Sequence, residues 1–367
     1  MYIFTFSLLF FSAFSDIFLK KGKYYILLFI AILCWFIFHD GFRWGIATDW
    51  NPYYNFFTNC LTIENTGMEP GYVFLNKLIR SFTENYSVFL VFHSIIVYSL
   101  ISKSVIKYSI SPLFSFFLFY CLMLSYLGMN RQYLAFAICI YSYKFIFERK
   151  FLAFLLCVVL AFLFHKSAIM FFLAYFLNRE LSTKFILGIL FFVVLISLLG
   201  IINKIPVSFL YLFDESVGDK MTFYVNSDDS NNIYFSILSL LKRSFWLIIA
   251  IAYKKGIKNK DEFFNFFFNS YFLGAIIYIL LNNTVFQVII SRGLLYYNIA
   301  EIFLIPYLLT VFKEGISKLI IFFLIIIYGY LLIDKGFSYY KESLGVDIFR
   351  PYNSVFMNNT YDALEKK

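Results

Sequence analysis

Five ionisable side chains stand where the chain passes between apolar segments, and their types suit acid–base and anion-binding chemistry. They are Arg131, Arg292, Asp49, Glu69 and His165. A guanidinium can bind phosphate oxygens through two parallel hydrogen bonds, and a carboxylate or an imidazole can accept a proton from a reacting hydroxyl. Together they fit a reaction in which a hydroxyl group displaces an anionic leaving group.

The segment "GFRWGIATDWNPYYNFF" mixes aromatic rings with charges. It supplies Arg43, a third candidate cation for a diphosphate, and it surrounds Asp49 with the rings of Trp44, Trp50 and Tyr53. Aromatic faces stack on the C–H faces of sugar rings, and carboxylates accept hydrogen bonds from sugar hydroxyls. The segment therefore indicates a saccharide site, although an aromatic belt at a membrane surface has the same composition.

Membrane helices are the elements that must position these residues. Hydrophobic residues make up 61% of the 367 residues and charged residues only 14%, and the mean hydropathy is +0.77. This is the composition of a polytopic membrane protein. The net charge of +9 comes from lysines in short loops, where they act as topology signals, so nucleic acid is excluded as a partner. We expect an all-α fold with a single transmembrane bundle over residues 1–367.

Apolar stretches of roughly the length of a membrane span recur along the chain. They lie near residues 2–19, 24–40, 86–102, 111–127, 131–147, 151–177, 185–202, 233–253, 263–281, 293–312 and 318–333. The stretch 151–177 is too long for one ordinary span and holds His165 in its middle. Counted as two short arms, it brings the total to about twelve hydrophobic segments.

The distribution of basic residues predicts which side of the membrane each loop faces. Short loops rich in lysine stay in the cytoplasm, so Lys20, Lys21 and Lys23 place the first loop there. A single helix over 151–177 would export the lysine cluster at 254–260, whereas a short hairpin that turns at His165 keeps this cluster cytoplasmic. We therefore predict the hairpin, with His165 at the outer side in a protein-lined cavity.

The same topology predicts three outer regions. They are a main loop at 41–85, a second loop at 203–232 and the C-terminal tail at 334–367. The main loop contains an amphipathic helix that begins at Pro70, directly after Glu69. Apolar side chains recur at helical spacing along it, so we expect it to lie at the membrane interface.

Arg131 and Arg292 each begin a span on the outer side, and two such arginines could clamp a diphosphate. Tyr296 lies one turn after Arg292 and is a candidate for substrate contact. The alternative is structural, with an arginine paired to Asp49 or Glu69.

Lys242 and Arg243 lie near the middle of the span 233–253. Intramembrane cations cost about 2.5–3.5 kcal/mol each on insertion scales. Either they line a wet cavity that holds a lipid phosphate, or the span begins later and this helix is amphipathic.

No His, Cys, Asp and Glu residues have the spacing of a metal site, so we predict a reaction that needs neither a metal nor a cofactor.

Several motifs occur in an order that resembles the EpsG family of bacterial polysaccharide polymerases, which are related in role to Wzy. The motifs are "FRWGIATDW", "MEPGY", "MNRQYLAFAI", "LAFLFHKSAIM", "SRGLLYY" and "FRPYNSVF". The resemblance covers nearly the whole chain. One departure is Ala47, which stands at a position where the family often has glycine.

The resemblance implies an enzyme that joins oligosaccharide repeat units carried on undecaprenyl diphosphate, at the outer face of the bacterial cytoplasmic membrane. In that role Arg131, Arg292 and Arg43 would bind the diphosphate, and Asp49, Glu69 or His165 would take the acceptor proton. Membrane lipid, a flippase and a chain-length regulator are the implied partners. Two alternatives share these residues: a flippase for lipid-linked sugars, and a glycosyltransferase that uses a polyprenyl-phosphate sugar. The product class, whether O-antigen, capsule or exopolysaccharide, is left open.

Overall fold

Helices form the regular structure of the protein. The computed structural model describes residues 1–63, 67–204, 233–254, 262–282, 284, 286, 290, 292–312 and 315–357. Among these residues the only other regular pairing is one isolated antiparallel bridge between Arg43 and Ser354. The predicted all-α class is therefore confirmed for this part of the chain. The predicted second outer loop, 203–232, lies outside the described residues beyond Lys204.

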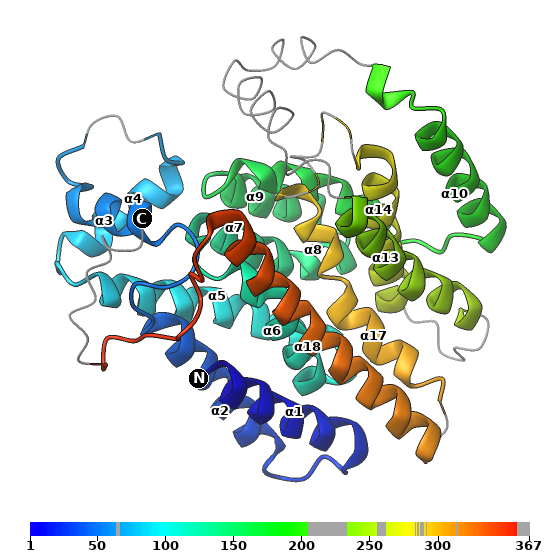
Figure 1. Ribbon diagram of the computed structural model, residues 1–367, viewed down its shortest axis with the longest axis horizontal. Coiled ribbons are helices and arrows are strands. Elements are labelled where there is room, and N and C mark those ends of the chain that lie inside the picture. The colour runs from blue at the N-terminus through cyan, green and yellow to red at the C-terminus, as the bar shows by residue number, and fades with distance from the viewer. Residues whose placement is uncertain are drawn as a thin grey trace. The chain divides into compact units, whose positions relative to one another are not determined.

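Two compact units divide the chain, and the sequence analysis did not anticipate this division. The first unit is Met1–Phe172 with Glu314–Lys367, and the second is Leu173–Lys313. Helices of the first unit are α1 (Tyr2–Phe18), α2 (Tyr25–Gly41), α3 (Trp50–Asn59), α4 (Pro70–Arg80), α5 (Tyr86–Tyr108), α6 (Pro112–Met123), the 3₁₀ helix η1 (Leu124–Tyr126), α7 (Asn130–Tyr141), α8 (Tyr143–Phe147), α9 (Phe151–Phe162) and α18 (Ile316–Leu344). The second unit contains α10 (Thr183–Leu198), η3 (Ile202–Lys204), α13 (Ile233–Tyr253), α14 (Glu262–Leu281), α16 (Leu295–Asn298) and α17 (Glu301–Leu309), and the 3₁₀ helix η2 (Lys166–Leu177) runs from the first unit into it (Figure 1).

Three of the described helices, α5, α14 and α18, are long and apolar enough to cross a membrane, and shorter apolar helices accompany them. The protein is thus an integral membrane protein. α14 begins one residue before its predicted start, at Glu262. α18 continues to Leu344, so the tail predicted from residue 334 begins as part of this helix. The total of about twelve spans stays a prediction.

Two predicted spans are each divided into two helices. Residues 131–147 form α7 and α8, which meet at Ser142. The Ser142 hydroxyl donates to the Cys139 carbonyl at 2.7 Å, a local bond that competes with regular helical pairing. Residues 293–312 likewise divide into α16 and α17.

A buried carboxylate joins α1 to α6 in the first unit. Asp16 accepts hydrogen bonds from the backbone N–H of Leu113 at 2.8 Å and of Phe114 at 3.3 Å. These are free donors at the start of α6, where Pro112 occupies the first turn. The hydroxyl of Tyr25 donates to the same carboxylate at 2.9 Å. Asp16 therefore caps a helix that lies far away in the sequence.

The apolar stretch 151–177 is not one continuous helix. α9 ends at Phe162 and η2 begins at Lys166, so His165 lies between the two elements. The rings of Phe151 and Phe172 are 6.2 Å apart, and those of Phe154 and Phe171 are 5.8 Å apart. These pairs are 21 and 17 positions apart and could not touch along a straight helix, which rises about 1.5 Å per residue, so the chain folds back between them.

Candidate functional site

Three distant parts of the sequence are joined through backbone hydrogen bonds in the first unit. The Trp44 N–H donates to the Asn353 carbonyl at 3.1 Å, and the Ala47 N–H donates to the Ile348 carbonyl at 2.8 Å. The Thr48 N–H donates to the Leu127 carbonyl at 3.2 Å. The loop at 42–49 is thereby fixed to the segment that precedes α7 and to the C-terminal segment that follows α18.

Close backbone contact at this junction requires a glycine. Gly128 has a φ of +98°, and a Cβ atom at this position would lie 2.2 Å from the Thr48 carbonyl oxygen. No side chain fits at that distance, so only glycine lets the two loops meet here.

Ala47 adopts the left-handed conformation, with a φ of 74°. This is the position at which the resemblance to the EpsG family led us to expect glycine. A non-glycine residue in this region carries a cost of about 1–2 kcal/mol. The turn therefore forms as the family pattern implies, with some strain in the backbone.

Replacing Ala47 with glycine is expected to stabilise the protein by up to about 1 kcal/mol, because the relieved strain exceeds the added chain entropy of the unfolded state. A higher thermal unfolding midpoint of the purified protein would be the measurement. Ala153→Gly, within α9, should lower the midpoint, because glycine disfavours a helix interior. A lower midpoint for Ala47→Gly as well would contradict the strain argument.

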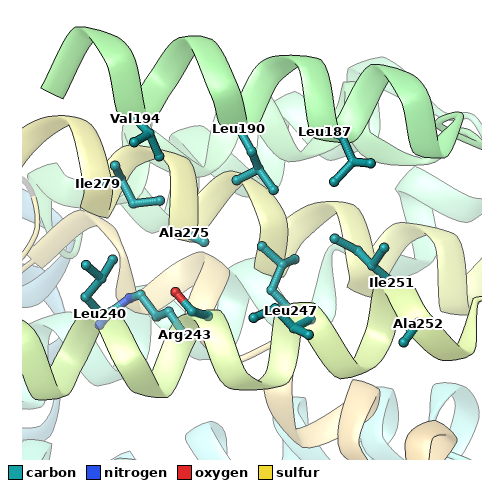
Figure 2. Close-up of a pocket in the computed structure, with 12 residues that line it drawn as sticks. Leu187, Leu190, Val194, Leu240, Arg243, Leu247, Ile251, Ala252, Ala275 and Ile279 are labelled. Carbon is teal, nitrogen blue, oxygen red and sulfur yellow. The ribbon is translucent and has the colours of Figure 1, made fainter. Parts of the chain in front are cut away.

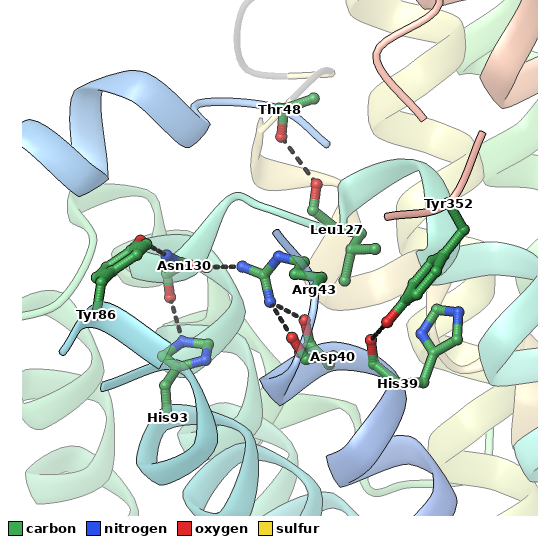
Figure 3. A network of polar contacts seen from close by, with 9 residues as sticks. All are labelled: His39, Asp40, Arg43, Thr48, Tyr86, His93, Leu127, Asn130 and Tyr352. Carbon is green, nitrogen blue, oxygen red and sulfur yellow. Dashed lines mark hydrogen bonds and ion pairs between the residues drawn. The ribbon is translucent and has the colours of Figure 1, made fainter. Parts of the chain in front are cut away.

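Arg43 is buried in a network of polar groups and does not face open space (Figure 3). It is 1% exposed, and its guanidinium forms an ion pair with Asp40, which is 2% exposed. A second nitrogen, Nη2, donates to the Asn130 side-chain oxygen at 2.7 Å. The side-chain amide of Asn130 donates in turn to the Tyr86 hydroxyl at 3.1 Å, and the backbone carbonyl oxygen of Asn130 lies 2.9 Å from His93 Nε2. The network thus fixes the first residue of α7, next to Arg131.

Arg131 is brought together with Glu69 and Tyr53. Its Nη1 lies 2.6 Å from Glu69 Oε2, and its Nε donates to the Tyr53 hydroxyl at 3.1 Å. The Arg131 side chain is 22% exposed and that of Glu69 is 10% exposed. Nη2 of Arg131 makes no hydrogen bond within the described residues, so one edge of the guanidinium can still bind a ligand. Glu69 precedes α4 as expected, but its carboxylate does not cap that helix and pairs with Arg131.

The start of α4 also contacts the end of α9. The Gly71 N–H donates to the Leu163 carbonyl at 2.8 Å, and a Cβ at Gly71 would lie 2.8 Å from the same oxygen. The Lys166 N–H donates to Glu69 Oε1 at 3.4 Å. These contacts bring the chain around His165 beside the Arg131–Glu69 pair.

His165 is 8% exposed, and its Nδ1 accepts a hydrogen bond from the Ser167 N–H at 3.2 Å. A nitrogen that accepts from a backbone N–H carries no proton, so the neutral ring bears its proton on Nε2. In this form His165 can donate a hydrogen bond from Nε2 to an anion.

Tyr53 is linked to both candidate acidic residues: its backbone N–H donates to the Asp49 carbonyl at 3.2 Å, and its hydroxyl accepts from Arg131, which also pairs with Glu69. Burial raises the pKa of its hydroxyl, Arg131 lowers it in part, and Asp49 and Glu69 both raise it. Tyr53 therefore stays protonated. Asp49 is exposed and has a φ of 53°, at the residue before α3. The other rings form a cluster, with Trp50 between Trp44 at 5.3 Å and Tyr86 at 5.3 Å.

The remaining candidates lie in the second unit. Arg292 is exposed and precedes α16, whereas Tyr296 within α16 is 1% exposed and packs in the core. Arg243 lines a cavity of about 440 Å³ between α10, α13 and α14, whose other walls are almost entirely aliphatic (Figure 2). The guanidinium carbon of Arg243 lies 3.9 Å from the centre of the Tyr278 ring. The side chain of Lys242 lies outside what the structure describes.

A family model, the EpsG family, matches residues 23–354, which is nearly the whole chain. The chain belongs to the EpsG family. A search of curated proteins found no match, and a search of solved structures found none either. Membership gives this protein a polysaccharide polymerase role in exopolysaccharide synthesis.

The sequence analysis missed three residues of the buried network around Arg43. Asp40, His93 and Asn130 hold the buried network of this EpsG protein, yet none was a candidate. Asp40 and Arg43 are three residues apart at the end of α2, a spacing that could have indicated their pairing.

Among the described residues no group of three or more His, Cys, Asp or Glu side chains could hold a metal ion. Metal independence stays a prediction.

Proposed function

We propose that this protein polymerises oligosaccharide repeat units carried on undecaprenyl diphosphate, at the outer face of the bacterial cytoplasmic membrane. The observation that carries the proposal is Arg131, held by Glu69 and Tyr53 with one guanidinium edge left for a ligand, in a chain of the EpsG family. A fixed, partly exposed guanidinium suits a diphosphate, and the neighbouring aromatic residues suit sugars.

In the proposed reaction the acceptor hydroxyl oxygen forms a bond to the anomeric carbon of the donor glycan. The bond between that carbon and the diphosphate oxygen breaks, and the diphosphate leaves on its lipid with the bonding electrons. Arg131 stabilises the negative charge that develops on this leaving group, and His165 donates a hydrogen bond to it from Nε2. Arg292, in the second unit, stays a sequence-based prediction as a second cation.

The acceptor proton passes to a carboxylate. Glu69 is engaged by Arg131, with its Oε2 2.6 Å from the guanidinium. Asp49 is exposed and lies one helical turn before Tyr53, whose backbone N–H donates to the Asp49 carbonyl at 3.2 Å. We therefore assign Asp49 as the base and Glu69 as the residue that positions Arg131.

Within the second unit, the cavity beside Arg243 is a separate candidate site for membrane lipid. Its aliphatic walls suit an isoprenoid chain, and the guanidinium suits an anionic head group.

Deletion of the gene, followed by electrophoresis of the surface glycan, tests the function. We expect the polymer to disappear while single repeat units still reach the surface. Complete loss of surface sugar would instead indicate a flippase or an enzyme that assembles the repeat unit. Unchanged chain lengths would contradict any role in polymerisation.

The proposed hairpin places Lys166 outside and Lys184 in the cytoplasm, and both residues are exposed. In a variant whose five cysteines have been replaced, Lys166→Cys should react with a membrane-impermeant maleimide in intact cells. Lys184→Cys should react only after the cells are opened. Labelling of both from outside would mean that 151–177 crosses the membrane once.

A further inference from the structure

A polar hollow lies in the first unit where three distant segments meet. Its volume is about 270 Å³, and it is lined by Trp44, Asn85, Ser87, Ser354, Val355 and Met357. Trp44 belongs to the loop at 42–49, Asn85 and Ser87 begin α5, and the other three belong to the C-terminal segment. The isolated bridge between Arg43 and Ser354 holds the first and last of these segments together.

Two of the lining residues, Ser87 and Ser354, carry hydroxyl groups that make no hydrogen bond within the described part of the chain. Ser87 is 8% exposed and Ser354 is 5% exposed. Asn85 uses its side-chain oxygen to accept from the Ser87 N–H at 2.9 Å, and this cap leaves its amide N–H groups free to donate. The wall thus offers hydroxyl and amide groups that the described residues do not engage, and such donors and acceptors suit an uncharged ligand rich in hydroxyls.

The aromatic side of the hollow supports the same ligand class. Trp44 is half-buried and stands edge-on to Trp50, with the ring centres 5.3 Å apart, so its orientation is fixed. An indole ring can stack on the C–H face of a sugar ring, and its N–H can donate to a hydroxyl. None of the six lining residues carries a charge, so the hollow suits a neutral sugar better than a phosphate.

Residues of the hollow also connect to the Arg131 site. Ser87 follows Tyr86, whose hydroxyl accepts from Asn130, the residue before Arg131. Trp44 follows Arg43, which bonds to the same Asn130 side chain. The backbone that shapes the hollow is therefore fixed by the same network that fixes the start of α7.

We propose that this hollow is a saccharide subsite that binds one sugar ring of the repeat unit, with Trp44, Asn85, Ser87 and Ser354 as its contacts. This rests on the proposed function for the identity of the saccharide. It adds the C-terminal segment, which sequence reasoning gave no binding role, to the substrate site.

Saccharide binding can be measured apart from polymerisation. The probe is the free repeat-unit oligosaccharide, released by mild acid from the lipid-linked pool of the host, without lipid or phosphate. Saturation-transfer NMR with the full-length protein in nanodiscs reports its dissociation constant. Asn85→Asp keeps the helix-capping oxygen and removes the N–H donors, and Ser354→Leu fills the hollow. Each should weaken binding roughly tenfold, the effect of losing one or two hydrogen bonds.

Matched variants outside the hollow serve as controls. Ser343→Leu, near the end of α18, and Asn59→Asp, at the end of α3, should bind the oligosaccharide as the wild type does. Arg131→Ala should also keep this binding although it blocks polymerisation. If Asn85→Asp and Ser354→Leu bind as tightly as the wild type, the subsite is refuted while the polymerase function stands. If gene deletion leaves chain lengths unchanged but both variants lose the oligosaccharide, the polymerase function is refuted and the subsite stands.

Discussion

Arg131→Ala should reduce polymerisation by roughly two to three orders of magnitude, the usual effect of removing one group that stabilises charge in a transition state. Surface glycan should then consist of single repeat units, with the protein at its normal level in the membrane. The physical reason is that Arg131 presents a guanidinium already fixed at 2.6 Å from Glu69 and 3.1 Å from the Tyr53 hydroxyl. Gel electrophoresis of the glycan and immunoblotting of membranes are the measurements.

Arg80 offers a matched control for Arg131. It also pairs with a glutamate, Glu84, at 3.1 Å, but Glu84 is 87% exposed and the pair lies within one helix and the residues after it. Exposed pairs of this kind contribute about 0–1 kcal/mol, so Arg80→Ala should leave chain lengths unchanged. Wild-type chain lengths in Arg131→Ala would refute the diphosphate role and reduce the Arg131–Glu69 pair to a structural contact.

Arg131→Lys separates charge from geometry. Lysine keeps the positive charge, but it cannot reach Glu69 and Tyr53 through a rigid planar fork. We therefore expect partial activity, well below the wild type and above Arg131→Ala. Activity as low as that of Arg131→Ala would mean that the planar geometry of the guanidinium matters more than its charge.

The sequence predicted that Arg131 needs either a ligand or a carboxylate, and the structure contains the carboxylate. It could not decide between Asp49 and Glu69, because the choice depends on where α4 begins relative to α7. One contact that places the start of α4 is the contact of Gly71 with Leu163 at the end of α9, which no periodicity reveals. Helices and their apolar character were predictable, since a bilayer imposes length and composition on each span.

Other features were unpredictable because they depend on long-range contacts. The bridge between Arg43 and Ser354 joins residues over 300 positions apart, and local propensity says nothing about such pairs. For the same reason the hollow beside Trp44 could not be foreseen. Tyr296 was a candidate for substrate contact because it lies one turn after Arg292, yet its side chain is buried, with 1% exposed. Residues one turn apart share a face only within one helix, and Arg292 lies before the start of α16.

Substitution of Arg43 tests whether this buried arginine stabilises the fold or binds the diphosphate. Arg43→Met should destabilise the protein by about 3–5 kcal/mol, because it leaves the Asp40 carboxylate charged and buried without its partner. Asp40 is 2% exposed, so water cannot replace the lost guanidinium. The thermal unfolding midpoint of the purified protein, followed by tryptophan fluorescence, and the amount of protein in membranes should both fall.

The double variant Asp40→Leu, Arg43→Met should recover most of that loss, because an apolar pair of similar volume often replaces a buried ion pair without net cost. Arg350 and Asp347 supply the control, since they have the same spacing of three residues and an Nε–Oδ2 distance of 2.6 Å, but Arg350 is 45% exposed. Arg350→Met should change stability by at most about 1 kcal/mol. If Arg43→Met instead kept the wild-type midpoint and lost polymerisation, Arg43 would act on the diphosphate, as its place in the sequence first indicated.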